Sequence, residues 1–201
     1  MASAGCATSP RTREVVEERF ASGAPEVVGT EIEVEPGRWL ADGLWRQYYE
    51  DGSLEVEWHF RAGVEEGTWT AWFETGSMHM RGNFIGGYEE GVWVEFHENG
   101  KKANEGRYAA GEEDGAWTHW YASGSLASVE YYDCGDRRGV WQEWYEDGQL
   151  KSRYDYGDDG RIISKVELLP DGAPDPLDGG FVIDPEARLL LRNAADQRVW
   201  R

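Results

Sequence analysis

The sequence lacks most of the features that mark other protein classes. Two cysteines, Cys6 and Cys134, are too few for a disulfide scaffold, and no apolar run approaches the roughly 18 residues of a membrane-spanning helix. Leucine, isoleucine and valine are too sparse for a conventional compact core. Basic residues are also scarce, 20 against 39 acidic ones, so the net charge is −19. Because such an excess of carboxylates repels phosphate groups, nucleic acid and anionic membranes are not expected as partners.

Motifs for catalysis and metal binding are missing as well. There is no phosphate-cradling glycine loop, no nucleophile elbow and no alternation of strands with helices. The histidines do not have the close spacing of a zinc motif, as their positions show: His59, His79, His97 and His119. The acidic loops lack the alternating Asp/Asn spacing with which calcium is held. The sequence therefore predicts a protein that is not an enzyme and holds no metal or other cofactor.

What the chain does contain is a 24-residue unit that occurs five times without insertion. The copies begin at Gly43, Gly67, Gly91, Gly115 and Gly139. Counted from that glycine, the third place is always tryptophan: Trp45, Trp69, Trp93, Trp117 and Trp141. The sixth place is always aromatic, and the seventh is Tyr or Phe except for His97. A fixed short period built from one small motif is the signature of a repeat array.

Glycine also recurs at the tenth place, where Asp51-Gly52 and Asp147-Gly148 are examples. Asp-Gly and Asn-Gly between aromatic runs are the strongest short-range hairpin signal, because these turns need positive φ. A second glycine-bounded turn spans residues 63–67 and recurs in the next three copies. Each repeat is therefore predicted to be one β-hairpin, and the fold to be an all-β, elongated antiparallel meander of five hairpins.

Strand alternation assigns the side chains to faces. Third- and seventh-place aromatics should share one face, and the sixth-place aromatic should lie on the other. In the second strand, Leu54 and Met78 have the parity of Phe60 and Phe84, which predicts a shared face. Rows of rings, added repeat by repeat, should supply most of the stability.

This pattern, G-x-W-x-x-[WYF]-[YF]-x-[DN]-G followed by a second G-x-x-x-G turn, resembles the MORN-repeat variant of bacteria, whose members include YwqK-type antitoxin proteins. The resemblance covers about 120 of the 201 residues. It implies a hairpin-repeat scaffold and, for the antitoxin members, neutralisation of a toxin. The third copy departs from the pattern at His97 and Lys102, and the fifth has Asp159 in place of the second-turn glycine.

The flanking segments are predicted to cap the array. Residues 1–24 should be disordered or weakly helical, with a short helix over residues 11–20. Residues 25–42 should form a capping strand ahead of the five repeats at 43–162. Residues 163–201 should hold a degenerate sixth repeat, a loop and a short helix at residues 187–195, where Asp184 and Pro185 form a good helix start.

The segment Ser3-Ala4-Gly5-Cys6 resembles the end of a bacterial lipobox. Cys6 would then carry a lipid and the protein would lie in the outer envelope, provided that a signal peptide precedes this sequence. As the sequence stands, the charged and apolar parts of a signal peptide are missing and a cytoplasmic location is the default.

Two features suggest binding of a protein partner, which the acidity of the chain suggests is basic. The first is an aromatic face, with Trp93, Trp117 and Tyr121 as candidate anchors. The second is an acidic comb on the second turns, formed by Glu65, Glu66, Glu89, Glu90, Glu112 and Glu113. The plain alternative is that the rings pack inside the fold and the loop charges are merely solvated. Two other functions stay open: an antitoxin or immunity role, implied by the resemblance alone, and a carbohydrate-binding envelope lipoprotein, since rows of rings also suit sugar faces.

Overall fold

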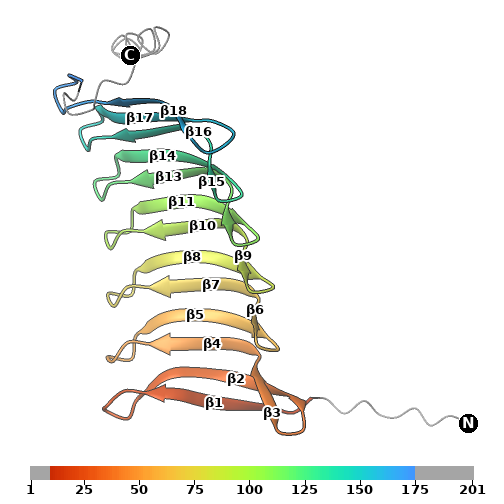
Figure 1. Ribbon diagram of the computed structural model, residues 1–201. Helices are drawn as coiled ribbons and strands as arrows, with labels where there is room; N and C mark the ends of the chain where they lie inside the picture. Colours follow the sequence, from red (N-terminus) through yellow and green to blue (C-terminus); the bar gives the residue numbers. More distant parts are fainter. Residues whose placement is uncertain (1–9, 175–201) are drawn as a thin grey trace, which may run out of the picture. The chain divides into compact units, whose positions relative to one another are not determined.

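Every described element of the protein is a β-strand. A computed structural model describes residues 10–174, and this part of the chain holds 18 strands and no helix, hence no helix that could cross a membrane. Antiparallel pairings join the two strands of a hairpin. Further antiparallel pairings join successive hairpins within each unit (Figure 1). The predicted all-β meander of hairpin repeats is confirmed.

The chain forms two units. Unit 1 comprises Met1–Lys101 with Tyr108–Gly111, and unit 2 comprises Lys102–Arg107 with Glu112–Arg201. The strands of unit 1 are β1 (Thr12–Arg19), β2 (Pro25–Glu35), β3 (Arg38–Ala41), β4 (Gly43–Tyr48), β5 (Leu54–Arg61), β6 (Val64–Glu65), β7 (Gly67–Trp72), β8 (Met78–Ile85), β9 (Tyr88–Glu89) and β10 (Gly91–Phe96). β11 (Lys102–Ala109) contributes to both units. The strands of unit 2 are β12 (Glu112–Glu113), β13 (Gly115–Trp120), β14 (Leu126–Asp133), β15 (Asp136–Arg137), β16 (Gly139–Trp144), β17 (Leu150–Tyr156) and β18 (Ile162–Glu167).

The first turn of each repeat closes the hairpin through the tenth-place glycine. In the turn between β4 and β5, the N–H of Gly52 donates to the carbonyl of Tyr49 over 2.9 Å, and the N–H of Tyr49 donates to Ser53 over the same distance. Gly52 has a φ of 87°, a conformation that costs glycine little and other residues much more. This strict demand explains why glycine recurs at the tenth place.

The second turn is held by the repeat before it. The N–H of Gly87 donates to the carbonyl of Glu65 over 2.9 Å, and the side chain of Glu66 accepts a hydrogen bond from the N–H of Gly86 over 3.0 Å. Glu90 caps Ala110 in the same way, also over 3.0 Å. Successive turns in unit 1 are therefore interlocked by backbone and carboxylate contacts every 24 residues.

A β-bulge changes the predicted assignment of faces. In β7–β8 the register runs from Ala71 opposite Met80 to Trp72 opposite Met78, so His79 is an extra residue. One extra residue reverses the alternation beyond it. Met78 therefore lies on the face opposite to Phe84, and the prediction that they share a face is wrong.

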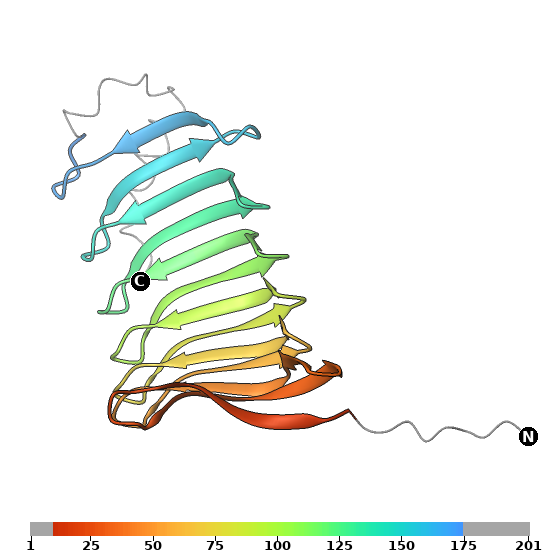
Figure 2. The ribbon, with the colours of Figure 1, turned by 60° about the horizontal axis from the view of Figure 1, so that its bottom comes forward.

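The N-terminal segment is a sixth hairpin rather than a helix and a single capping strand. Residues 12–19 form β1, which pairs with β2 (Figure 2). Its turn has the first-turn hydrogen bonds of a repeat, with Phe20 bonded to Ala24 and Gly23 bonded to Phe20. Val15 lies opposite Gly29, where a complete repeat has tryptophan. The predicted helix over residues 11–20 is thus wrong, because pairing with β2 holds this charged segment as a strand.

The far end of unit 2 begins another repeat. β18 pairs with β17, and the N–H of Gly172 donates to the carbonyl of Leu169 over 2.8 Å, as in the first turns. Residues 162–172 therefore have a strand and a first turn like those of a repeat, and the predicted degenerate repeat over residues 163–201 stays a prediction. The helix predicted at residues 187–195 and the lipidation residue Cys6 lie outside the described residues.

Candidate functional site

On one face of unit 1, here called the tryptophan face, Trp45 and Trp93 each pack against the strand before them. A Cβ added to Gly82 would lie 2.0 Å from Cδ2 of Trp93, so the indole ring lies directly on the glycine backbone. Trp93 also meets Phe84 edge-on, with a centroid distance of 5.3 Å and an interplanar angle of 90°. Trp45 sits on Gly29 in the same manner and donates from Nε1 to the carbonyl of Thr30 over 3.0 Å.

The same arrangement recurs in unit 2. Trp117 lies on Gly106, again with 2.0 Å to a hypothetical Cβ. Trp141 instead follows a strand that carries Glu130 at the equivalent place, and its ring contacts Tyr132 and Tyr156 at centroid distances of 5.1 and 5.0 Å. The row of rings predicted from the repeat is therefore present in each unit.

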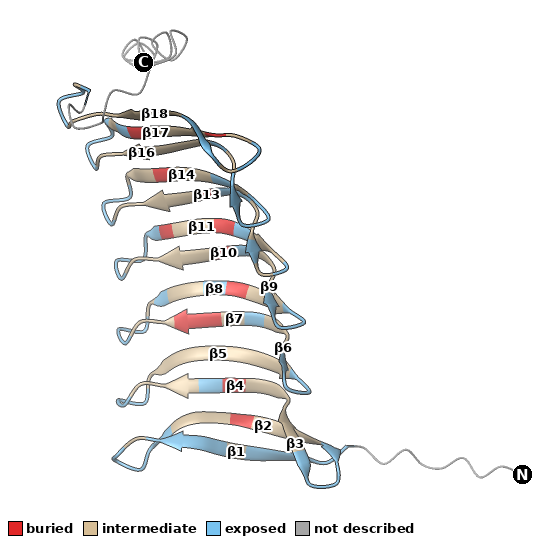
Figure 3. Ribbon diagram, in the orientation of Figure 1, coloured by how far each residue is buried: buried red, intermediate tan, exposed pale blue. Residues whose placement is uncertain are grey.

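Whether a glycine underlies the ring decides how deeply the tryptophan is buried. Trp45, Trp93 and Trp117, each on a glycine, are 3%, 8% and 7% exposed. Trp69 follows a strand with Trp58 at this place, Trp141 follows one with Glu130, and both are only half-buried. The residue at the sixteenth place of one repeat therefore sets how deeply the tryptophan of the next repeat is buried. Figure 3 shows that buried residues form only short stretches of the strands, and that β1 is mostly exposed.

The three predicted anchor residues are used largely in contacts within the chain. Trp93 and Trp117 are buried among residues of the chain itself, so they offer little area to a partner. Tyr121 is half-buried, and its hydroxyl donates to the carbonyl of Trp144, 23 residues later, over 2.8 Å. Tyr49 bonds Trp72 in the same way, and Tyr145 bonds Leu168. Sequence parity revealed the rows but not this clamp between successive repeats.

The predicted acidic comb of unit 1 separates into two kinds of carboxylate. Glu66 and Glu90 are used to cap the next second turn. Glu65 is half-buried beside Phe60 and makes no hydrogen bond or ion pair with any residue in the described range 10–174. Burial raises the pKa of its carboxyl, and the charge of Glu89 raises it further. Glu65 and Glu89 are thus like charges on successive turns.

In unit 2 the second turn at β12 carries Glu112, which is exposed, and Glu113, which is half-buried. Burial and, after it, the charge of Glu130 raise the pKa of Glu113. Glu130 accepts a hydrogen bond from the hydroxyl of Tyr132 over 2.9 Å. Burial, followed by this bond to Glu130, raises the pKa of Tyr132 above its ordinary value. A group of carboxylates therefore lies on the tryptophan face close to the turn.

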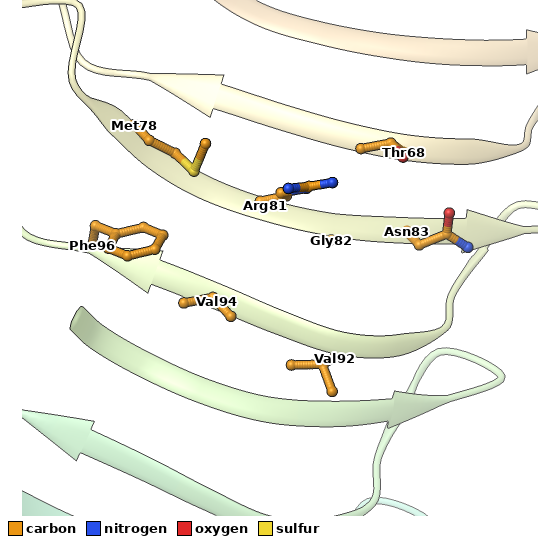
Figure 4. A pocket seen from close by; sticks show the side chains of 8 residues that line it. All are labelled: Thr68, Met78, Arg81, Gly82, Asn83, Val92, Val94 and Phe96. Carbon is orange, nitrogen blue, oxygen red and sulfur yellow. The ribbon is translucent and has the colours of Figure 1, made fainter. Parts of the chain in front are cut away.

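The opposite face of unit 1 holds a groove, here called the Arg81 groove, with a volume of about 410 Å³ (Figure 4). Its lining consists of Thr68, Met78, Arg81, Gly82, Asn83, Val92, Val94 and Phe96. The first-strand residues alternate with the buried tryptophan, which sends Val92, Val94 and Phe96 to this side. Sequence reasoning missed the groove because the bulge that places Met78 here could not be foreseen.

No group of three or more His, Cys, Asp or Glu side chains within residues 10–174 is arranged to hold a metal ion. The histidines serve local contacts: His79 stacks on Phe73 at 4.3 Å and lies 3.3 Å from Glu95. His119 hydrogen-bonds to Asn104.

Comparison with known families gives a match to the model described as "MORN repeat variant", over residues 41–62, 89–110, 113–133 and 137–158. Four segments of the chain are thus similar to the MORN repeat variant. The matched MORN repeats coincide with hairpins of the structure, and the MORN family is generally a non-enzymatic repeat scaffold. The repeat beginning at Gly67 has the same hairpin geometry although it lies outside the matched segments.

Other comparisons add little to the MORN match. No curated protein matches the chain. Among solved structures, a chain of the GtfA/B complex bound to UDP and GlcNAc is 10% identical with a TM-score of 0.24, over 56% of this chain and 22% of that one. This chain therefore spans about a fifth of that GtfA/B chain. A Bacteroides fragilis protein with unknown function is 9% identical with a TM-score of 0.17, over 80% and 94% of the two chains. Likenesses this distant carry no argument about function.

Proposed function

We propose that the protein is a non-enzymatic scaffold that binds a basic protein partner through the carboxylates of its second turns. Glu65 is the observation that carries this proposal. Its carboxyl has a raised pKa through burial and through Glu89, and no cation among residues 10–174 pairs with it. A lysine or arginine of a partner would relieve the repulsion between these two side chains.

The chain's own cations cannot neutralise its acidic surface. With 39 acidic and 20 basic residues, 19 negative charges of the chain remain uncompensated. Electrostatic attraction over such a surface favours fast association with basic proteins and falls with ionic strength. Because the buried tryptophans offer little area, the contact is assigned to the turns, with Glu65 and Glu89 in unit 1 and Glu112 and Glu113 in unit 2.

The test uses a fluorescently labelled, lysine-rich peptide as the probe and measures anisotropy at physiological salt. The test variant replaces four second-turn carboxylates with amides: Glu65→Gln, Glu89→Gln, Glu112→Gln and Glu113→Gln. The control variant removes the same charge from exposed residues of the first turns: Glu50→Gln, Glu74→Gln, Glu98→Gln and Glu146→Gln.

If each second-turn carboxylate contributes about 0.5 kcal/mol, the test variant should bind about 30-fold more weakly, because 1.4 kcal/mol is tenfold. The control variant should stay close to the unmodified protein. Equal losses in both variants would show general attraction to an acidic surface and would refute a binding site on the second turns.

An antitoxin is a narrower form of the same proposal, in which the partner is a basic toxin encoded beside this protein. Co-expression with the neighbouring reading frame tests it. The antitoxin form predicts that the neighbour is toxic alone and harmless together with this protein, whereas a harmless neighbour contradicts it.

A further inference from the structure

We propose that the Arg81 groove binds an extended peptide segment that carries a carboxylate side chain between apolar side chains. The groove lies on the opposite face of unit 1 from Glu65, and it differs from the second-turn surface in charge and in partner chemistry. Figure 4 shows that its side chains come from β7, β8 and β10.

The charge of the groove resides on Arg81. This side chain is exposed and makes no hydrogen bond, ion pair or ring contact with any described residue. Its cross-strand neighbours are Thr70 on β7 and Val94 on β10, neither of which is charged. In a chain with a net charge of −19, a solitary guanidinium between uncharged neighbours is an unfilled position for a carboxylate.

The preceding repeat shows what fills this position when the chain supplies both partners. There Arg46 lies opposite Glu57, and its Nε donates to Oε2 of that residue over 2.9 Å. Arg81 occupies the place of Glu57 in the next repeat, where threonine replaces the basic partner. A carboxylate from another molecule can therefore pair with Arg81 as Glu57 pairs with Arg46.

The apolar side chains that line the groove determine which residues of the peptide should flank its carboxylate. Val92 is 60% exposed and Met78 is 36% exposed, and Val94 and Phe96 are half-buried beside them. Exposed apolar side chains next to a cation favour a ligand with an acidic centre and apolar flanks. The side chains of three strands, about 4.8 Å apart, enclose a strip that an extended peptide spans.

The experiment titrates the full chain with the capped peptide Leu-Glu-Phe and with its isosteric control Leu-Gln-Phe, by calorimetry and by amide shifts of Val92 and Val94. Because a hydrogen bond to a charged group stabilises by about 1.5–3 kcal/mol, the Glu peptide should bind about tenfold or more tightly than the Gln peptide. Arg81→Gln should abolish that difference, and Arg61→Gln, which removes an exposed cation outside the groove, should leave it unchanged.

A second variant, Val94→Glu, supplies the missing carboxylate from the cross-strand neighbour of Arg81. It should abolish binding of the Glu peptide while the fold, followed by circular dichroism, stays intact. Equal binding of the two peptides, no binding at millimolar concentration, or binding of octanoate in place of the peptide would each overturn the proposal.

Discussion

The indole ring of Trp93 lies on the backbone of Gly82, so close that a methyl group on this glycine would penetrate the ring. The two residues belong to different repeats, and the contact joins one hairpin to the next. Gly29 with Trp45 in unit 1 and Gly106 with Trp117 in unit 2 repeat the relationship.

Gly82→Ala should therefore destabilise the protein. The added Cβ would lie 2.0 Å from the ring and force Trp93 outward, and overpacking of this kind costs about 1–3 kcal/mol. Chemical denaturation gives the loss, and near-ultraviolet circular dichroism reports the displaced indole. Gly76→Ala is the control, because its Cβ meets nothing within 4 Å although its φ is 81°. The control should lower stability without altering the tryptophan signal; an unchanged signal for Gly82→Ala would contradict the packing described.

Tyr121→Phe should lower the free energy of unfolding by about 0.5–1.5 kcal/mol, because it removes the hydrogen bond to the carbonyl of Trp144. The reverse change is available in unit 1, where Phe73 stands at the same place of its repeat. Phe73→Tyr should gain a bond to the next repeat and raise stability by a similar amount. Thermal and urea unfolding measure both. If Tyr121→Phe leaves stability unchanged but weakens binding of the lysine-rich peptide, Tyr121 acts as an anchor after all.

Ala110→Gly should stabilise the protein by about 0.5–1 kcal/mol, since Ala110 has a φ of 51° and a left-handed conformation strains a residue with a Cβ. The equivalent residue of the preceding repeat is already Gly86, with a φ of 60°. Gly86→Ala should thus lower stability by a comparable amount. Urea denaturation should show changes of opposite sign in the free energy of unfolding of the two variants. Changes of equal sign would show that backbone strain at this place does not distinguish Ala110 from Gly86.

Glu65→Gln should raise the melting temperature at pH 7 and have little effect at pH 4. Burial and Glu89 raise the pKa of Glu65 in the folded protein, so the folded state binds the proton more tightly than the unfolded state does. The favourable contribution of the protonated carboxyl is complete below the unfolded pKa and is lost as pH rises through the folded pKa. Scanning calorimetry from pH 4 to pH 7 measures the trend. Glu50→Gln, at an exposed first turn, corrects for the general loss of one charge.

The repeat fold could be predicted from the sequence because its turns are chemically strict. Glycine at the tenth place adopts positive φ, as Gly52 does, and few alternatives exist. The alternation of Val94 and Phe96 with the buried Trp93 also followed from strand parity. The bulge at His79 could not be predicted from strand parity, because it depends on the pairing between strands.

Other features had sequence signals that were present but weak. Phe20 and Gly23 have the spacing of Tyr49 and Gly52, which marks the additional N-terminal hairpin. This hairpin was not predicted, because it lacks the tryptophan of a complete repeat and its first strand is highly charged. The role of glycine at the sixteenth place could not be predicted either. Only the structure shows that the tryptophan of the following repeat packs on this glycine. The Arg81 groove combines residues of three strands, which no local pattern defines.

Because the tryptophan that packs on each of these glycines belongs to the following repeat, the repeats of this array are not freely exchangeable. Removing residues 91–114 would bring Trp117 next to the strand that bears Gly82, a matched junction. Removing residues 67–90, a piece of equal length, would bring Trp93 onto the strand that bears Trp58, so Trp93 would take the half-buried place that Trp69 holds in the intact protein. The site of a deletion therefore decides which tryptophan becomes deeply buried, although every cut preserves the period.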